Sequence, residues 1–186
     1  MANTVANVTA GKPALTGAVY RAVLTDGLAI PTDATTALAA DFKALGYVSD
    51  EGLTNTNSPD TDNIKAWGGD TILVVQNEKN DEFGLTLVEI LNTDVLKTVY
   101  GSSNVTGTLA DGLSVEATAD EAEEAAWVIE MVARGGVLHR IVIPDGKISE
   151  IGEITYADDQ VVGFELTIQA LPDSNGATHY EYFKSA

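Results

Sequence analysis

The stretch Gln160–Leu171, QVVGFELTIQAL, decides the fold class, because its apolar and polar residues alternate. Neighbouring side chains of a strand point to opposite faces of the sheet. The apolar face carries Val162, Phe164, Leu166 and Ile168. The polar face carries Glu165, Thr167 and Gln169. A strand with one face in the core and one in water is typical of an antiparallel sheet.

Most of the remaining chain also predicts short strands separated by turns. Gly135-Gly136 separates the apolar segments Trp127–Val132 and Val137–Ile143, which indicates a hairpin. Pro144-Asp145-Gly146 is predicted to be a turn, because proline fixes φ and glycine permits a positive φ. About ten short strands are predicted in total.

A second hairpin and one helix are predicted in the middle of the chain. Thr71–Glu78 and Phe83–Ile90 are rich in β-forming residues, and Lys79-Asn80-Asp81 between them predicts a turn. A helix is predicted over Asp94–Tyr100, capped by Asn92 or Thr93 and stopped by Gly101. This helix is too short to be stable alone, so we expect it to pack on a sheet.

The chain has 186 residues, which is the size of one domain. We expect an extended N-terminal arm over residues 1–14, because these residues are small, polar and aperiodic. Residues 15–186 are then a single domain, with a long polar loop at about 50–63, DEGLTNTNSPDTDN. The predicted fold is mainly β: an antiparallel β-sandwich or partly closed barrel with one short flanking α-helix.

The composition excludes several classes of protein. The formal net charge is −18, and ten Lys and Arg residues form no basic patch, which disfavours nucleic-acid binding. There is no cysteine and therefore no disulfide framework or thiolate metal site. No secretory signal and no run of 18 apolar residues is visible, so we expect folding in the cytoplasm without a membrane.

No pattern predicts catalytic, cofactor-binding or metal-binding residues. His139 and His179 lack partners at metal-ligand spacing and are read as strand residues. Asp60-Thr61-Asp62-Asn63 begins like a calcium loop, but Ile64 and Lys65 stand where such a loop needs an oxygen ligand and glycine. Trp67 and Trp127 are interpreted as core or interface anchors. These features favour a structural protein over an enzyme.

Seven segments together resemble the major tail proteins, or tail tube proteins, of long non-contractile-tailed phages of Gram-positive and especially actinobacterial hosts. The resemblance covers about Gly11–Phe183, and its most specific parts are Lys65–Asp70 and Arg140–Pro144. The segments are GAVYRA, IPTDATTAL, FKALGYVSDEGL, NIKAWGGDTILVVQNEKNDEF, LVEILNTDVLKTVYG, RIVIPDGKISEIGEITY and GFELTIQALPDSNGATHYEYF.

The resemblance implies a β-sandwich subunit that forms hexameric rings. The inner sheets would join into a barrel around a channel, and the rings would stack into a tube in the virion, assembled in the bacterial cytoplasm. The expected partners are further copies, a tape-measure protein, and tail terminator and tail-tip proteins, while phage DNA passes without specific binding. A channel lined by carboxylates would repel its phosphates.

The resemblance also suggests which residues make contacts. Contacts between rings or subunits are expected from Asn3, Thr4, Val5, Asp50, Glu51, Leu53, Asn55, Asn57, Asp60, Asp62 and Trp67. Channel-lining acidic residues are expected to include Glu78, Glu89, Asp50 and Glu51.

The alternative is a virion decoration protein or a receptor- or carbohydrate-binding β-sandwich. Such a module would gather aromatic side chains in loops. The sequence instead places Tyr20, Tyr47, Trp67, Tyr156 and Phe164 in predicted strands. This placement favours the tube subunit.

Overall fold

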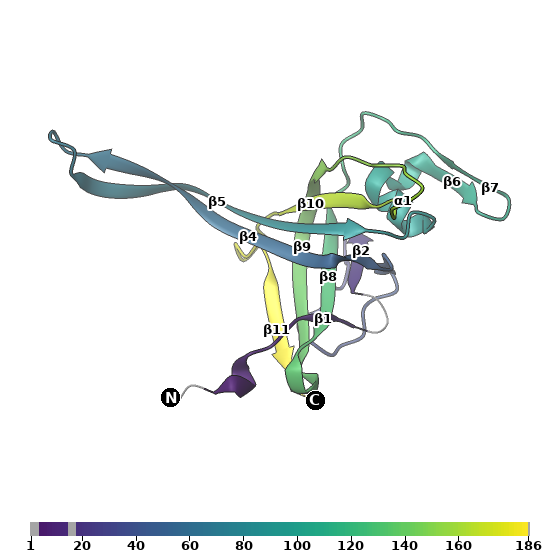
Figure 1. The fold of residues 1–186 in the computed structure, drawn as a ribbon, viewed down its shortest axis with the longest axis horizontal. Helices are drawn as coiled ribbons and strands as arrows, with labels where there is room; N and C mark the ends of the chain where they lie inside the picture. The colour runs from purple at the N-terminus through teal and green to yellow at the C-terminus, as the bar shows by residue number, and fades with distance from the viewer. Residues whose placement is uncertain (1–3, 15–17, 186) are drawn as a thin grey trace.

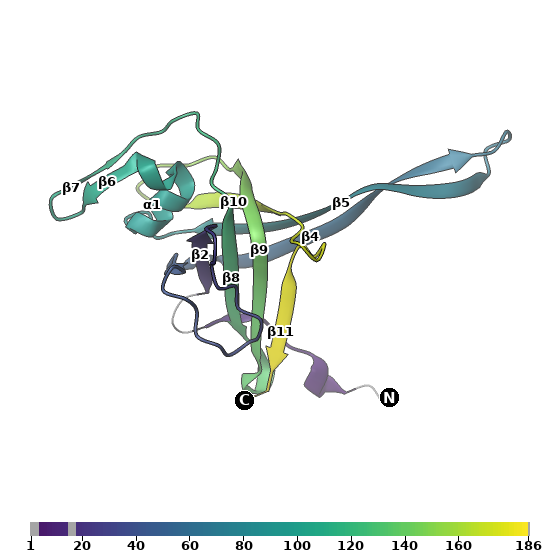
Figure 2. The ribbon, with the colours of Figure 1, turned by 180° about the vertical axis from the view of Figure 1, so that it is seen from behind.

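The computed structural model describes residues 4–14 and 18–185. Within these residues the fold is mainly β, with antiparallel sheets, one α-helix and no closed barrel. The predicted sandwich-like fold class is thereby confirmed. Figures 1 and 2 show the molecule from opposite sides.

The chain forms eleven strands, one α-helix and three short 3-10 helices in the described residues. The strands are β1 (Lys12–Pro13), β2 (Val19–Val23), β3 (Lys43–Ala44), β4 (Val48–Lys65), β5 (Thr71–Leu87), β6 (Val105–Thr108), β7 (Gly112–Val115), β8 (Ala125–Val132), β9 (Leu138–Ile151), β10 (Phe164–Ala170) and β11 (Tyr180–Lys184). The helices are α1 (Thr93–Tyr100), η1 (Val5–Asn7), η2 (Ser102–Asn104) and η3 (Arg134–Gly136).

Nine strands form one bent antiparallel sheet. Its order is β3-β2-β8-β9-β10-β5-β4, while β1 pairs with β8 and β11 pairs with β9. Strands β8, β9 and β11 run steeply in Figure 1, and β4, β5 and β10 run across them. β9 joins the two directions, because its first part pairs with β8 and its last part pairs with β10. The sheet therefore encloses its core as a sandwich does.

The strand predicted within 160–171 is β10, which covers only Phe164–Ala170 and leaves Val162 outside, and it confirms the alternation read from the sequence. In β10 the buried residues are Phe164, Leu166, Ile168 and Ala170, and the residues between them are more exposed. They pack with Trp127, which is fully buried and donates a hydrogen bond from its indole Nε1 to Gly146 O at 3.4 Å. Trp127 is thus a core residue.

The predicted helix is confirmed and begins one residue earlier, at Thr93. Of the two candidate caps, Asn92 is the one used, because its side chain accepts a hydrogen bond from the Asp94 amide at 3.0 Å. Gly101 ends the helix with φ 95° and donates its amide to Lys97 O. Val95 and Leu96 are buried against the sheet, as expected for a helix this short.

The two predicted turns in the second half have opposite outcomes. Gly135 and Gly136 turn the chain between β8 and β9 with φ 77° and 80°, as predicted. The turn at Pro144-Asp145-Gly146 is wrong, because these residues lie inside β9. Gly146 is needed there for close packing: a Cβ would lie 3.0–3.2 Å from Ile168, Trp127 and Ile143.

The long polar loop at 50–63 and the hairpin within 71–90 are also wrong. Residues 50–63 belong to β4, and Lys79-Asn80-Asp81 lies in the middle of β5. The two strands pair from Val48↔Leu87 to Lys65↔Thr71 and form one long hairpin. Water reaches both faces of its outer part, so its residues need not alternate, and cross-strand hydrogen bonds satisfy the backbone.

Candidate functional site

The β4–β5 hairpin extends far beyond the body of the molecule (Figure 1). Every residue of β4 from Thr54 to Lys65 and of β5 from Thr71 to Asn80 is exposed. An isolated two-stranded ribbon is only marginally stable in water. The exposed faces and the free edge of β4 are therefore surfaces on which another chain can pack or pair.

The tip of the hairpin is a glycine turn that presents a tryptophan. Ala66 donates its amide to Asp70 O at 2.8 Å, and Gly69 donates to Ala66 O at 3.0 Å. Gly68 and Gly69 have φ 118° and 101°, which only glycine adopts without strain. Trp67 is fully exposed between them and Ala66. The sequence reading of Trp67 as a core residue does not hold, whereas its interface role stays a prediction.

Exposed apolar side chains gather at the tip and at the start of β5. They are Ile64, Trp67, Ile72, Leu73, Val74 and Val75. Exposed apolar side chains gathered at one end of a hairpin are typical of an interaction site. We call residues 64–75 the hairpin tip.

A buried carboxylate fixes the hairpin where it leaves the body. Asp81 is only 1% exposed. Its Oδ2 accepts hydrogen bonds from Thr178 Oγ1 and His179 Nδ1, both at 2.5 Å. Its Oδ1 accepts from Asn55 Nδ2 at 2.8 Å. The network thus ties both hairpin strands to the segment just before β11.

The same network sets the protonation of Asp81. Burial alone would raise the pKa of this carboxyl group, but hydrogen bonds from Thr178, Asn55 and His179 outweigh it and lower the pKa below its usual value. Asp81 is therefore a carboxylate at neutral pH.

The sheet face turned away from the core is strongly acidic. Residues that pair directly across strands share a face. Alternate residues of β4 from Thr54 to Asp62 lie on the face turned away from the core. Their partners, followed from strand to strand, extend this face over β5, β10 and the end of β9. Its carboxylates are Asp60, Asp62, Glu78, Glu82, Glu150 and Glu165. Its single lysine in that register, Lys147, bonds to Glu121 at 2.8 Å. We call this surface the acidic face.

The acidic face is costly for the isolated chain. Asp60 lies directly opposite Glu78, and like charges in that position destabilise a strand pair. Stability therefore gives no reason for this pair, and a function of the assembled protein is the better explanation.

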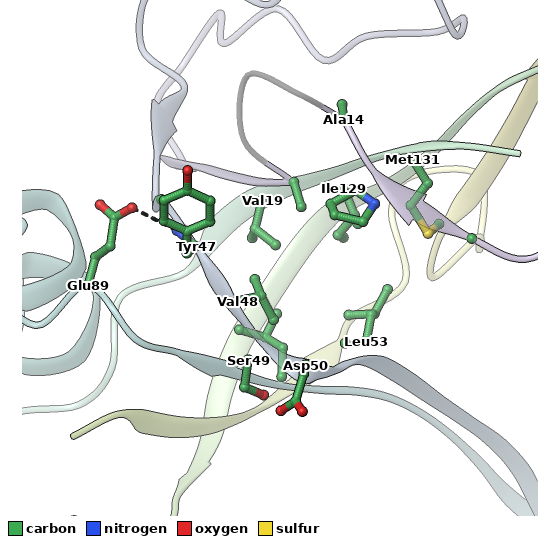
Figure 3. A pocket seen from close by; sticks show the side chains of 16 residues that line it. Ala14, Val19, Tyr47, Val48, Ser49, Asp50, Leu53, Glu89, Ile129 and Met131 are labelled. Carbon is green, nitrogen blue, oxygen red and sulfur yellow. Dashed lines mark hydrogen bonds between the residues drawn. The ribbon is translucent and has the colours of Figure 1, made fainter. Parts of the chain in front are cut away.

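A cavity of about 540 Å³ lies at the root of the hairpin. It is bounded by the first residues of β4, by β1, by the start of β2 and by β8 (Figure 3). Its apolar side chains include Val19, Val48, Leu53, Leu85, Ile129 and Met131. The charged residues beside it are Asp50 and Glu89, and Glu89 Oε1 accepts a hydrogen bond from the Tyr47 amide at 2.9 Å. We call it the root cavity.

The N-terminal segment lies on β8 and on the turn that follows it. Ala14 donates its amide to Glu130 O at 3.0 Å. The amide of Arg134 donates to Thr9 Oγ1 at 2.7 Å, and its guanidinium donates to Val5 O at 3.2 Å. The described part of the arm, residues 4–14, thus lies on its own subunit, where β1 also pairs with β8.

The residues expected to make contacts fall into three places. Thr4 and Val5 lie in the N-terminal segment, and Asn3 lies outside the described residues. Asp50 and Leu53 border the root cavity, and Glu51 lies in the bulge of β4 that interrupts its pairing. The hairpin strands carry Asn55, Asn57, Asp60 and Asp62, and Trp67 stands at the tip.

Of the four expected channel residues, the register places only Glu78 on the acidic face. Glu89 follows β5 and bonds to Tyr47, while Asp50 and Glu51 precede the regular pairing. The sequence reasoning did not find Glu82, Glu150 and Glu165. The alternation of β10 could have located Glu165, because it places that residue opposite the apolar face.

The described residues contain no cluster of His, Asp or Glu side chains suited to a metal ion. Both histidines hold carboxylates, His179 bonding to Asp81 and His139 Nε2 to Glu181 Oε2 at 2.7 Å. The described part of the chain has no helix of the length and apolarity that a membrane crossing requires.

A family model described as phage tail tube protein matches residues 2–186. The chain belongs to this family. It is therefore a structural protein of a phage tail, which assembles with copies of itself into a tube and associates with other tail proteins. This membership agrees with the resemblance noted in the sequence.

Other comparisons add little. A search of curated proteins finds no match. Among solved structures, the chain is similar to the anti-feeding prophage cap (AFP tube terminating cap), with 9% identity, a TM-score of 0.44 and full coverage of both chains.

Proposed function

We propose that this protein is the major tail tube subunit of a long, non-contractile phage tail, in a phage of a Gram-positive, actinobacterial host. Hexameric rings of the subunit stack into a hollow tube that houses the tape-measure protein and conducts the genome. The observation that carries the proposal is the outer part of the long hairpin, whose strands are exposed on both faces from Thr54 to Lys65 and from Thr71 to Asn80 and extend beyond the body. A ribbon of this length gains contacts for its exposed faces only from other subunits in an assembly.

Within a ring, the edge strand β4 pairs with a neighbouring subunit. β4 ends the path of the main sheet, so one row of its backbone N–H and C=O groups is free for another strand. Repeating this heterologous contact around an axis closes a ring and removes every edge. The sheet β4-β5-β10 then becomes one stave of the central barrel.

In that barrel the acidic face lines the channel, because the opposite face of β10 and of the inner part of β5 is buried in the subunit core, and the outer hairpin continues the same face. Six carboxylates per subunit, those of the acidic face, repel DNA phosphates. The absence of free cations there avoids the salt-dependent attraction that would retain the genome.

Between rings, the hairpin tip and the N-terminal segment make the contacts. The hairpin tip exposes apolar side chains away from the body. The N-terminal segment lies on the surface and bonds to Arg134 through Val5 and Thr9. The tube ends on tail terminator and tail-tip proteins and assembles in the host cytoplasm. The protein acts without catalysis and without a cofactor.

Electron microscopy of the purified protein tests this proposal. Hollow tubes with six-fold rings are the expected product, obtained at high protein concentration. Monodisperse single subunits under all conditions of salt and concentration would refute a tube subunit.

A virion decoration or receptor-binding module is the second candidate, and the structure offers one observation for it. Three of the aromatic side chains assigned to strands, Tyr47, Trp67 and Tyr156, lie outside strands and are exposed, so that part of the sequence argument is wrong. Glycan-array binding by a monomer that never polymerises would favour this candidate.

A further inference from the structure

The hairpin tip and the root cavity are matching surfaces on one chain. The tip presents Trp67 fully exposed, with apolar residues behind it. The cavity is open and mostly apolar, and Figure 3 shows Val19, Val48 and Leu53 around the same space. A volume of about 540 Å³ falls in the range of about 300–1,000 Å³ in which pockets hold small ligands. An indole ring therefore has room there.

The tip of a chain cannot enter the cavity of the same chain. Leu53 borders the cavity, and Lys65, at the end of β4, lies twelve residues further along the strand. At about 3.3 Å per residue, the tip stands about 40 Å away. Pairing from Leu53↔Leu85 to Lys65↔Thr71, with irregularities at Asp60/Thr61 and Ile64/Lys65, keeps the hairpin extended. The tip can therefore reach only the cavity of another copy.

One charge of the tip complements those of the cavity. The tip carries one cation, Lys65, two residues before Trp67, and one anion, Asp70, three residues after it. The cavity has two charged neighbours, the carboxylates of Asp50 and Glu89, and no cation among its lining residues. An entering tip thus brings a positive charge next to two negative ones.

The cavity also offers an acceptor for the indole N–H. Ser49 lines it, and Ser49 Oγ is buried without a hydrogen-bond partner among the residues that the structure describes. A buried indole N–H normally finds an acceptor, and a buried hydroxyl without a partner is rare. One contact between Trp67 and Ser49 would satisfy both groups.

We infer that Trp67 of one subunit inserts into the root cavity of a second copy of this chain, with Lys65 facing Asp50 and Glu89. This inference rests on the proposed function, to which it adds the site that binds the hairpin tip. Tip and cavity are different surfaces, so the contact repeated head to tail joins each ring to the next and extends the stack. Successive copies are then displaced by about one hairpin length, about 40 Å.

Cross-linking tests the contact directly, because the chain has no natural cysteine. Ala66→Cys places a thiol beside Trp67, and Tyr47→Cys places one on an exposed residue at the cavity. Mixed in equal amounts and treated with a short bis-maleimide, these two variants should give a dimer band. The matched control pairs Ala66→Cys with Leu109→Cys, an exposed residue of the β6–β7 turn, and should give none.

Two substitutions test the same contact without a cross-linker. Trp67→Ala removes the inserted group, and Val48→Trp fills the cavity; each should reduce tube yield at least tenfold. Leu91→Ala, an exposed apolar residue outside the hairpin, should leave the yield unchanged. Circular dichroism identifies any variant that fails to fold. If either variant fails to fold, the cross-linking experiment alone tests the contact.

The outcomes separate this inference from the proposed function. Wild-type tubes with six-fold rings but no link between Ala66→Cys and Tyr47→Cys would overturn the inference and leave the tube intact. A link from Tyr47→Cys to Val5→Cys of a neighbouring copy, in place of Ala66→Cys, would make the N-terminal segment the occupant and also overturn it. Failure of the wild-type protein to form tubes counts against the proposed function. The contact between tip and cavity can still be tested in that case, because cross-linking between copies is measured in concentrated solution.

Discussion

Single buried polar residues hold this β-rich subunit in shape. Arg140 is 4% exposed and uses its whole guanidinium group. Its Nε donates to Glu130 Oε1 at 3.0 Å, and its Nη1 donates to the carbonyl oxygens of Asp33 and Thr36, both at 2.8 Å. The arginine thereby attaches the segment before β3 to the sheet. A lysine has no planar fork and cannot reproduce these bonds.

Replacing Arg140 by alanine should cost about 3 kcal/mol of unfolding free energy, because it leaves the Glu130 carboxylate partly buried without its cation. Urea unfolding of dilute, monomeric protein measures the loss. The double variant with Glu130→Ala should lose less than the sum of the two single losses. Strict additivity would show that the pair does not act as a unit.

Asp81 makes a prediction about pH. Its pKa is lowered in the folded state, so the folded carboxyl group binds a proton less readily than the unfolded one. The stability that it adds is present above about pH 4, the ordinary pKa of aspartate, and is lost as pH falls through the folded value. Asp81→Asn should therefore lose about 2 kcal/mol at pH 7.

The loss caused by Asp81→Asn should shrink as the solution is acidified below about pH 4. Asp26→Asn, an exposed turn residue, is the matched control and should change stability little at any pH. An Asp81 variant whose loss is the same at pH 7 and pH 3.5 would contradict a role for the charge.

At the scale of elements, the hairpin separates assembly from folding. Replacing residues 59–79 by Asn-Gly joins the directly paired Ser58 and Asn80 through a two-residue turn. All of the removed residues except the half-buried Ala66 are exposed, so the melting temperature should stay within a few degrees of wild type. Tube formation should be abolished. Loss of folding in this variant would show that the hairpin belongs to the core.

The N-terminal segment makes a milder prediction. Deleting residues 1–11 removes the contacts of Val5 and Thr9 with Arg134 but none of the core. We expect a folded subunit that assembles poorly, because the segment serves a neighbouring copy. Sedimentation of assembled protein measures the effect. A normal tube yield from the truncated chain would remove this role.

Elements with one face in the core were predictable from the sequence, and the outer hairpin was not. β10 and α1 follow local patterns that burial imposes: a period of two in β10, and a cap and a stop in α1. In the outer hairpin, solvent on both faces removes that requirement, so Lys79-Asn80-Asp81 resembles a turn while lying in β5. The glycine pair after Trp67 was the only local signal of the true turn.

The site was predictable to a similar extent. Trp67 was expected to be a core or interface anchor because it is a large aromatic residue, and the family resemblance suggested that it makes contacts between subunits. The acidic face could not be derived, since a face depends on register and β5 has an irregularity opposite Asp60 and Thr61. The root cavity combines residues of β1, β2, β4 and β8, and no local pattern reports such an encounter.

At the scale of the whole molecule, charge and shape indicate one purpose. The net charge is −18, and six carboxylates gather on the acidic face, where Asp60 and Glu78 lie directly opposite each other. We propose that this charge repels another polyanion, the genome, in the tube. We also propose that the projecting hairpin and the free strand edge provide the contacts for stacking and ring closure.

A cryo-electron microscopy reconstruction of tubes grown from the purified protein tests the central claim most directly. We predict stacked six-fold rings around a hollow channel, lined by the acidic face with Asp60, Asp62 and Glu78 exposed to the lumen. The number of carboxylates facing the channel should far exceed the number of lysines and arginines. Solid fibres, or a channel with more cations than carboxylates on its wall, would contradict the account.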